Sequence, residues 1–211
     1  MASIKLKHSG GNGVIIAAPT SNPASDRTIT LPSTADGTML TTTNPKSKSV
    51  IQTVNMVKTD TVSLTMSTSY QDVSGFSISI TPEFANSKII LAGSIVLASR
   101  QQYSFGRFVR SINGGSDSSP TGWVGDAAGS RERSQFGNTY QIVSGHDSTQ
   151  GPMPVYAVDT DHNTTSVITY KLQWKNSSGT YSIYFNRSQT DGNDGNHARA
   201  CSHLTLMEVA A

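Results

Sequence analysis

The pattern of hydrophobic and polar positions predicts β-strands along most of the chain. Apolar residues alternate with polar ones over residues 76–81, 168–174 and 181–185, so that every second side chain falls on the same face. Residues 88–98 form a nearly continuous apolar run, which is expected of a strand covered on both faces. A last strand is expected over residues 202–209, close to the C-terminus. Loops rich in Gly, Asn and Asp separate these segments, and no helical period is evident.

The predicted fold class is therefore all-β. Residues 46–211 are expected to form an antiparallel β-sandwich, most simply a jelly roll. Residues 1–45 are predicted to be a separate β-rich shaft or anchor module. No repeat with a fixed period occurs, which argues against a long solenoid.

The N-terminal module is predicted to contain short hairpins. Ile4 and Leu6 alternate with lysines, and a turn and a second strand follow over residues 9–18. So short a β-rich segment buries too little surface to be stable alone, so we expect it to pair with other chains or with a partner. Residues 41–49 contain Pro45 and two lysines and are typical of a solvated hinge.

Composition limits the classes of function. The chain has 211 residues and a mass of 22.4 kDa, and 14% of its residues are charged, against about 25% in a typical soluble domain. The net charge of +2 excludes binding of nucleic acid or a membrane surface driven by charge. The first residues contain no apolar stretch as long as that of a signal peptide, so we expect folding and assembly in a bacterial cytoplasm.

The motifs of common enzyme classes are missing from the sequence. It contains no Gly-x-Ser-x-Gly, no phosphate-binding glycine loop with a lysine and no His-Glu-x-x-His. The glutamates, which could serve as a glycosidase pair, lie far apart at Glu83, Glu132 and Glu208. We therefore expect a protein that is not an enzyme and that uses no cofactor.

Two oxygen-rich loops resemble metal sites only in part. Residues 159–163 resemble the first half of a calcium loop, but Thr164 stands where that loop needs glycine and Tyr170 where it needs glutamate. Residues 191–195 are similarly rich in oxygen donors and are typical of a β-turn. Both loops are predicted to be solvated turns, with no metal.

The single cysteine, Cys201, excludes an intrachain disulfide and a cysteine-rich zinc site. We expect its thiol to be a small buried apolar group. His203 is expected to face outward, on the side of the strand opposite Cys201, so that the two side chains form no catalytic pair.

The arginines are concentrated in the middle of the chain, at Arg100, Arg107, Arg110, Arg131 and Arg133. They could form a cationic patch for acidic surface sugars. The alternative, which we favour, is pairing with Asp117, Asp126 or Glu132 across subunits, since arginine forms bidentate interface pairs.

The two tryptophans are predicted to differ. Trp174 lies on the apolar face of a strand and is expected in the core. Trp123 lies in a turn, where its indole would either stack on a sugar or pack within the loop.

Several segments resemble one family. Residues 67–82, 86–90, 125–131, 184–188 and 204–211 are similar to motifs in the C-terminal domains of bacteriophage tail-fibre and other virion appendage proteins, especially of phages of marine bacteria and cyanobacteria. Residues 4–40 resemble the β-rich segment that recurs in phage fibres. The resemblance implies a non-enzymatic homotrimer with β-sandwich heads around a threefold axis and an intertwined N-terminal shaft. The length favours a short tail fibre, a fibre tip or a head decoration.

The expected function is therefore that of a virion structural protein that contributes to host-surface attachment. The alternatives are a capsid decoration or head-fibre protein without receptor binding and a lectin-like carbohydrate-binding module. The expected partners are further copies of the chain, other virion proteins through residues 1–45 and a host surface glycan, with no nucleic acid and no membrane insertion. Loops on a rigid β-scaffold carry most recognition, and the candidate receptor-binding residues are Tyr103, Trp123, Arg131, Arg133, Asp191 and Asn193.

Overall fold

The computed structural model describes residues 3–17, 20–21, 23, 45–99, 103–137 and 148–211. The chain divides into two compact units, residues 1–40 and residues 41–211. Within the described residues the structure contains strands, turns and loops but no helix, so no helix there is long enough to cross a membrane.

The described part of the first unit is an antiparallel hairpin. Strand β1 (Ser3–Lys7) pairs with β2 (Gly13–Ala17), and Ile4 lies opposite Ile16. This confirms the hairpin predicted near the N-terminus. The strands expected over residues 28–31 and 38–41 lie outside the described residues.

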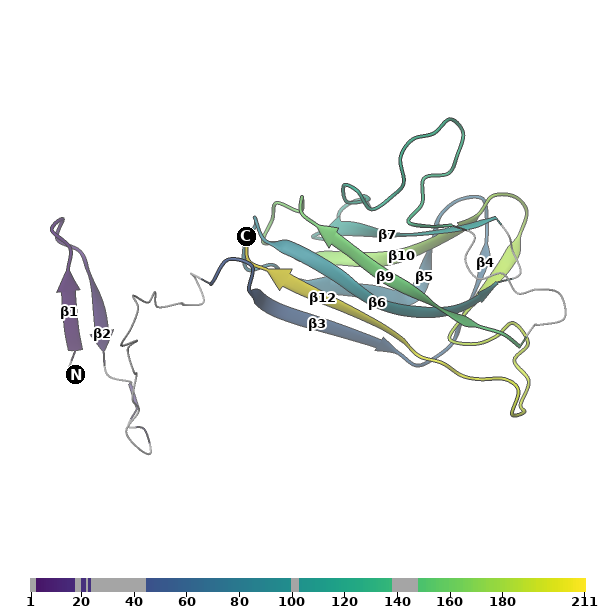
Figure 1. Ribbon diagram of the computed structural model, residues 1–211, viewed down its shortest axis with the longest axis horizontal. Coiled ribbons are helices and arrows are strands. Elements are labelled where there is room, and N and C mark those ends of the chain that lie inside the picture. Colours follow the sequence, from purple (N-terminus) through teal and green to yellow (C-terminus); the bar gives the residue numbers. More distant parts are fainter. Residues whose placement is uncertain (1–2, 18–19, 22, 24–44, 100–102, 138–147) are drawn as a thin grey trace. The chain divides into compact units, whose positions relative to one another are not determined.

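The second unit is an antiparallel β-sandwich (Figure 1). One sheet has the order β5-β10-β7-β8. Its strands are β5 (Gln71–Ile80), β10 (Ile168–Asn176), β7 (Ser104–Ile112) and β8 (Phe136–Gly137).

The second sheet is centred on β6 (Lys88–Ser99). β9 (Gly151–Asp159) pairs with one side of β6, and β12 (Ser202–Val209) and β11 (Tyr181–Phe185) pair one after the other with its other side. β3 (Val50–Lys58) continues the sheet beyond β12, and β4 (Val62–Met66) continues it beyond β11.

This strand order is that of a jelly roll. With β4 and β11 set aside as an added pair, eight described strands remain, β3, β5, β6, β7, β8, β9, β10 and β12. Numbered one to eight along the chain, they form one sheet in the order 1-8-3-6 and the other in the order 2-7-4-5. Two sheets joined in this way are the double Greek key of a jelly roll, which confirms the predicted fold class.

The core lies between the inward faces of the two sheets. Trp174, Tyr170, Phe76, Phe108 and Phe185 are its largest fully buried side chains. The Phe185 ring contacts both Phe76 and Trp174, with ring centroids 5.2 and 6.1 Å apart. The prediction that Trp174 belongs to the core is confirmed, as is the alternation that placed Ile168, Tyr170 and Leu172 beside it.

The two ends of the sandwich unit are fastened together. The backbone N–H of Lys48 donates to the carbonyl of Ala210, and the N–H of Ala210 donates to the carbonyl of Ser49, both at 3.0 Å. The segment that leads into β3 and the segment that follows β12 therefore lie at the same end of the sandwich, as Figure 1 shows. The turns β4–β5, β6–β7 and β10–β11 lie at the opposite end, where Asn176 and Ser177 donate to the carbonyls of Ser67 and Tyr103.

Candidate functional site

A long loop, residues 113–135, connects β7 and β8 and closes one side of the sandwich. Trp123 in this loop is only 5% exposed. Its indole stacks on Tyr170, with ring centroids 5.4 Å apart and an angle of 19° between the planes, and its Nε1 donates to the carbonyl of Val158 at 3.0 Å. Of the two alternatives predicted for Trp123, packing within the loop is confirmed, and the exposed indole that would stack on a sugar is wrong.

A buried ion pair lies beneath the same loop. Arg110 of β7 donates through Nη1 to Asp159 of β9 at 2.5 Å and to Asp161 at 2.7 Å. The Tyr170 hydroxyl donates to the second carboxylate oxygen of Asp159 at 2.7 Å, and burial together with this carboxylate raises the pKa of Tyr170. The cluster joins the two sheets and fixes the start of the β9–β10 connection.

The same cluster corrects the interpretation of residues 159–163 as a solvated turn. Asp159 is fully buried. A hydrogen bond from Thr121, supported by Arg110, lowers the pKa of Asp161 to about 2 although partial burial opposes the shift. These carboxylates are occupied by protein donors, and among the described residues no three His, Cys, Asp or Glu side chains are grouped as a metal site requires.

The outward face of the sheet β5-β10-β7-β8 carries a continuous polar network. Lys171 pairs with Asp117 at 2.7 Å and with Asp72 at 3.4 Å. The amide of Gln173 donates to both aspartates and accepts from Arg107 at 3.0 and 3.1 Å.

The network continues toward the β4–β5 turn. The Arg107 guanidinium lies 3.8 Å from the centroid of the Tyr70 ring, and Lys175 pairs with Glu132 at 2.5 Å. The acidic residues expected as arginine partners across subunits are thus bound differently, since Asp117 and Glu132 pair with lysines of the same chain. Arg100 lies outside the described residues.

A shallow pocket opens on this face beside a large β-bulge. Ser77 lies opposite Lys171 and Asp72 opposite Gln173, so residues 73–76 bulge out opposite Leu172. The pocket has a volume of about 180 Å³ and is lined by the bulge together with Asp72, Ser77 and Lys171. It is smaller than the roughly 300 Å³ at which ligand sites begin, and its two charged residues already pair with each other.

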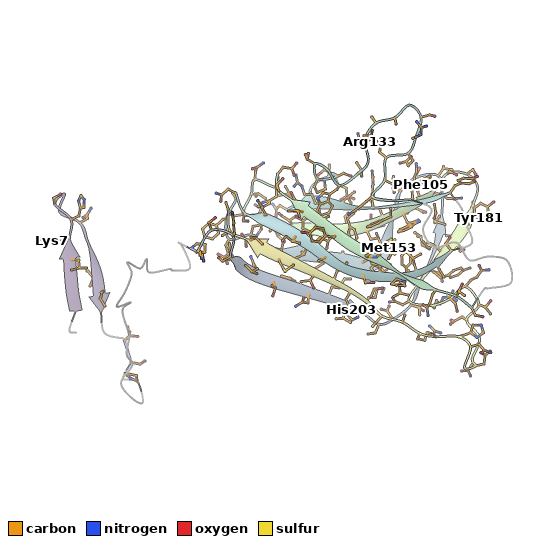
Figure 2. The ribbon with its side chains drawn as sticks, viewed as in Figure 1. Lys7, Phe105, Arg133, Met153, Tyr181 and His203 are labelled. Atoms are coloured by element: carbon orange, nitrogen blue, oxygen red, sulfur yellow. The ribbon has the colours of Figure 1, made fainter. Side chains whose placement is uncertain are left out.

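The remaining candidate receptor residues are distributed over three loops. Tyr103 is 55% exposed in the β6–β7 connection. Arg131 and Arg133 lie in residues 113–135, where Arg133 donates to the carbonyl of Gly125 at 2.7 Å (Figure 2). Asp191 and Asn193 lie between β11 and β12, and Asp191 pairs with Arg199 at 2.8 Å. The structure brings together members of the same loop, but the six residues do not form one group.

Cys201 and His203 are neighbours in the structure. The Sγ of Cys201 lies 3.2 Å from Nε2 of His203, and both residues are exposed. The expected opposite orientation was wrong because residues two apart along a strand share a face. The expected burial of the thiol was wrong as well, since Cys201 precedes β12 and lies outside the core.

Two buried polar residues were missed by sequence reasoning. Asn186 donates to the carbonyls of Lys58 and Asp60 and accepts from Ser202, which holds the β3–β4 turn against the start of β12. Glu208 of β12 accepts hydrogen bonds from Gln52 and from the backbone N–H groups of Glu83 and Phe84. The alternation of β12 could have placed Glu208 inward with Leu204 and Leu206.

No family profile and no curated protein sequence matches the chain. Among solved structures, it is similar to the infectious bursal disease virus Gx strain structure, with 16% identity and a TM-score of 0.38 over 95% of this chain and 46% of that chain. A VP2 subviral particle of the same virus shows 14% identity and a TM-score of 0.38, over 95% of this chain and 52% of that one. The chain thus spans about half the length of either, and neither likeness defines a family for it.

Proposed function

We propose that this chain is a structural protein of a bacteriophage virion, without enzymatic activity, that assembles as a homotrimer in a short tail fibre or fibre tip and contributes to host-surface attachment. The proposal rests on the resemblance of its segments to virion appendage proteins and on a fold made of a rigid jelly roll with a separate hairpin unit.

The hairpin is the observation that carries the assembly part of the proposal. Leu6, Ile15 and Ile16 are 61%, 55% and 49% exposed. A two-stranded hairpin is marginal in water unless a third strand or another surface covers its apolar residues. We infer that copies of this segment, or another virion protein, supply that cover.

The layout of the sandwich supports a role in display. The linker and the C-terminus are tied together at one end, so an attachment through residues 1–45 leaves the turns of the opposite end free. Tyr103 and Tyr181 are exposed among the elements of that end, at 55% and 48%. Exposed aromatic side chains on a rigid scaffold suit stacking on sugar rings.

The first test is the presence and position of the chain in purified phage particles. Labelled antibody against the sandwich is expected to bind intact particles at the tail and to slow adsorption to host cells. Labelling of the head with unchanged adsorption would instead support a capsid decoration protein. A chain that never appears in purified particles would exclude the proposal.

The second test addresses host attachment. Purified chain is expected to compete with phage adsorption, and Tyr103→Ala is expected to weaken that competition. Ser77→Ala, on the outward face of β5, is the control and is expected to compete like the wild type. Saturable sugar binding by a monomer that never enters particles would favour the lectin-like alternative.

The native mass tests the homotrimer. Three chains of 22.4 kDa give 3 × 22.4, about 67 kDa, in light scattering. A mass of one chain at micromolar concentration would contradict the trimer.

A further inference from the structure

The outward face of the sheet β9-β6-β12-β3 differs from the outward face of the opposite sheet, which carries the charged network. We propose that this face is the surface through which the sandwich binds a second copy of the chain. The inference rests on the proposed self-assembly of the chain. A face that binds its own copy joins two chains about a twofold axis, so this contact adds to the trimer proposed through residues 1–45 and does not form that trimer. His203 marks the position of this face on β12 (Figure 2).

The face is built from outward residues that lie side by side in register. One row runs Asn55, Thr205, Ala92 and Tyr156, and the next runs Val57, His203, Ser94 and Pro154. A third row contains Thr53, Met207, Ile90 and Val158. In these three rows no side chain is Asp, Glu, Lys or Arg. The next row, at the end of β6, contains the exposed Lys88 opposite Val209.

Its exposed apolar groups are large. Tyr156 is 70% exposed and Val57 is 60% exposed. Outward residues of an antiparallel sheet that faces water are normally polar. Depletion of charge together with an exposed Tyr and a partly exposed Met is typical of the centre of a protein interface.

The sequence of β6 also indicates that this face is covered by another protein surface. Residues 89–98 are mainly apolar on both faces, as in a strand covered on both sides. The structure covers one face with the core, where Ile89, Leu91, Ile95 and Leu97 are fully buried. The other face, with Ile90, Ala92 and Val96, is partly exposed in the single chain.

The opposite sheet gives the contrast within one molecule. Its outward face carries Asp72, Lys171, Arg107 and Lys175, which are engaged in the polar network described above. Burying that network against another protein would desolvate several charges. Burying the three rows named above desolvates no charge, and the next row adds only Lys88, so charge favours the sheet β9-β6-β12-β3.

The partner that this charge pattern fits is another copy of the same face. The three uncharged rows meet their own copy without like-charge repulsion, whereas a strongly charged partner would find no counter-charge in them. The β9 edge is closed to strand pairing. The backbone carbonyl of Val158 faces the free edge of β9, on the side away from β6, where it accepts a hydrogen bond from Trp123. The backbone groups of residues 152, 154 and 156 face the same edge, because every second residue of a strand has the same orientation. Pro152 and Pro154 therefore remove two donors from that edge, which leaves the face for association.

The size of the face is sufficient for a specific contact. Four strands about 4.8 Å apart span roughly 19 Å, and the full length of β12, with the row of Val209 and Lys88 included, spans roughly 27 Å at about 3.4 Å per residue. The product is roughly 500 Å² on each copy, so two copies bury on the order of 1,000 Å², the smallest total expected of a biological interface.

The test is sedimentation equilibrium of the full chain, with a negative charge placed on the face. Tyr156→Glu and Val57→Glu are each expected to raise the dissociation constant for self-association at least tenfold. Both side chains are mostly exposed, so the thermal unfolding of the variants is expected to match the wild type. Ser77→Glu places the same charge on the other sheet and is expected to change the constant less than twofold.

If the dissociation constants of all three variants equalled that of the wild type, the assignment of the face would be wrong. In that case self-assembly through the hairpin, and with it the proposed function, would still stand. A wild-type chain that is monomeric at every concentration would overturn the face and the homotrimer together, and the labelling of purified particles would then decide the virion role on its own.

Discussion

Arg110 of β7 and Asp159 of β9 form an ion pair that joins the two sheets of the sandwich. Their side chains are 11% and 0% exposed, and Nη1 lies 2.5 Å from Oδ1. A buried pair of this kind adds little stability relative to apolar residues of the same shape, but removal of one partner leaves a charge without compensation in the core. Substitution of Arg110 or Asp159 alone is therefore expected to destabilise the sandwich.

We expect Arg110→Met to lower the free energy of unfolding by about 3 to 5 kcal/mol, because Asp159 is left buried without its cation. Chemical denaturation followed by fluorescence measures the change. Lys171→Met is the matched control, since its ion pairs lie at the surface and its loss costs less than about 1 kcal/mol. Equal losses for the two variants would contradict a special role for the buried pair.

Trp123→Ala is expected to cost about 3 to 5 kcal/mol, as for other large core side chains. The reason is the loss of the stacking on Tyr170 and of the hydrogen bond to Val158. Trp123→Phe retains an aromatic ring and is expected to cost less. If Trp123→Ala unfolded at the denaturant concentration of the wild type, the indole would not belong to the core.

Glu208 is expected to make stability depend on pH in the acid range. Burial raises the pKa of this carboxyl, but hydrogen bonds from Gln52, Glu83 and Phe84 outweigh it, and the net shift is downward. A lowered pKa in the folded state gives stability that is present above the pKa of the unfolded chain, about 4.3, and is lost as pH falls through the folded value.

The measurement is the free energy of unfolding of the wild type and of Glu208→Gln at pH 7 and at pH 3. At pH 7 the variant is expected to be less stable, by about 1 to 3 kcal/mol. The difference between the two proteins is expected to shrink as pH falls through the lowered pKa of the folded carboxyl. A difference that stays constant with pH would show that the carboxylate charge does not contribute.

Gly106→Ala is expected to disturb the packing of Trp174. A Cβ at residue 106 would lie 2.3 Å from the Trp174 ring, which is fully buried and stacks on Phe136. Overpacking of this kind costs about 1 to 3 kcal/mol, and near-ultraviolet circular dichroism reports the displaced indole. Gly125→Ala is the control, because a Cβ there meets no atom within 4 Å. An unchanged spectrum for Gly106→Ala would refute the close contact.

The sequence predicted the strands better than the loops. The strand expected over residues 202–209 coincides with β12, and the run over residues 88–98 ends one residue before β6 does. The alternation along each strand also placed Trp174 in the core. These predictions depend on neighbours in sequence, because the faces of a strand follow from a period of two.

The candidate site was less predictable. Trp123 lies in a loop whose composition gives no sign of burial, and it is buried because residues 113–135 fold back over Tyr170 and Val158. The pairing of Arg110 with Asp159 links residues 49 positions apart. Such contacts depend on the register of strands that are distant in sequence.

The sequence by itself determined the all-β class, the N-terminal hairpin and the inward face of the main strands, because alternation and turn residues act locally. The tertiary structure alone decided the order of the strands in the jelly roll and the engagement of Asp159 and Asp161 by Arg110. It also separated an outward face with a network of charges from one with three uncharged rows of side chains. The physical reason is that pairing between distant strands chooses which outward residues lie side by side, and no local pattern contains that choice.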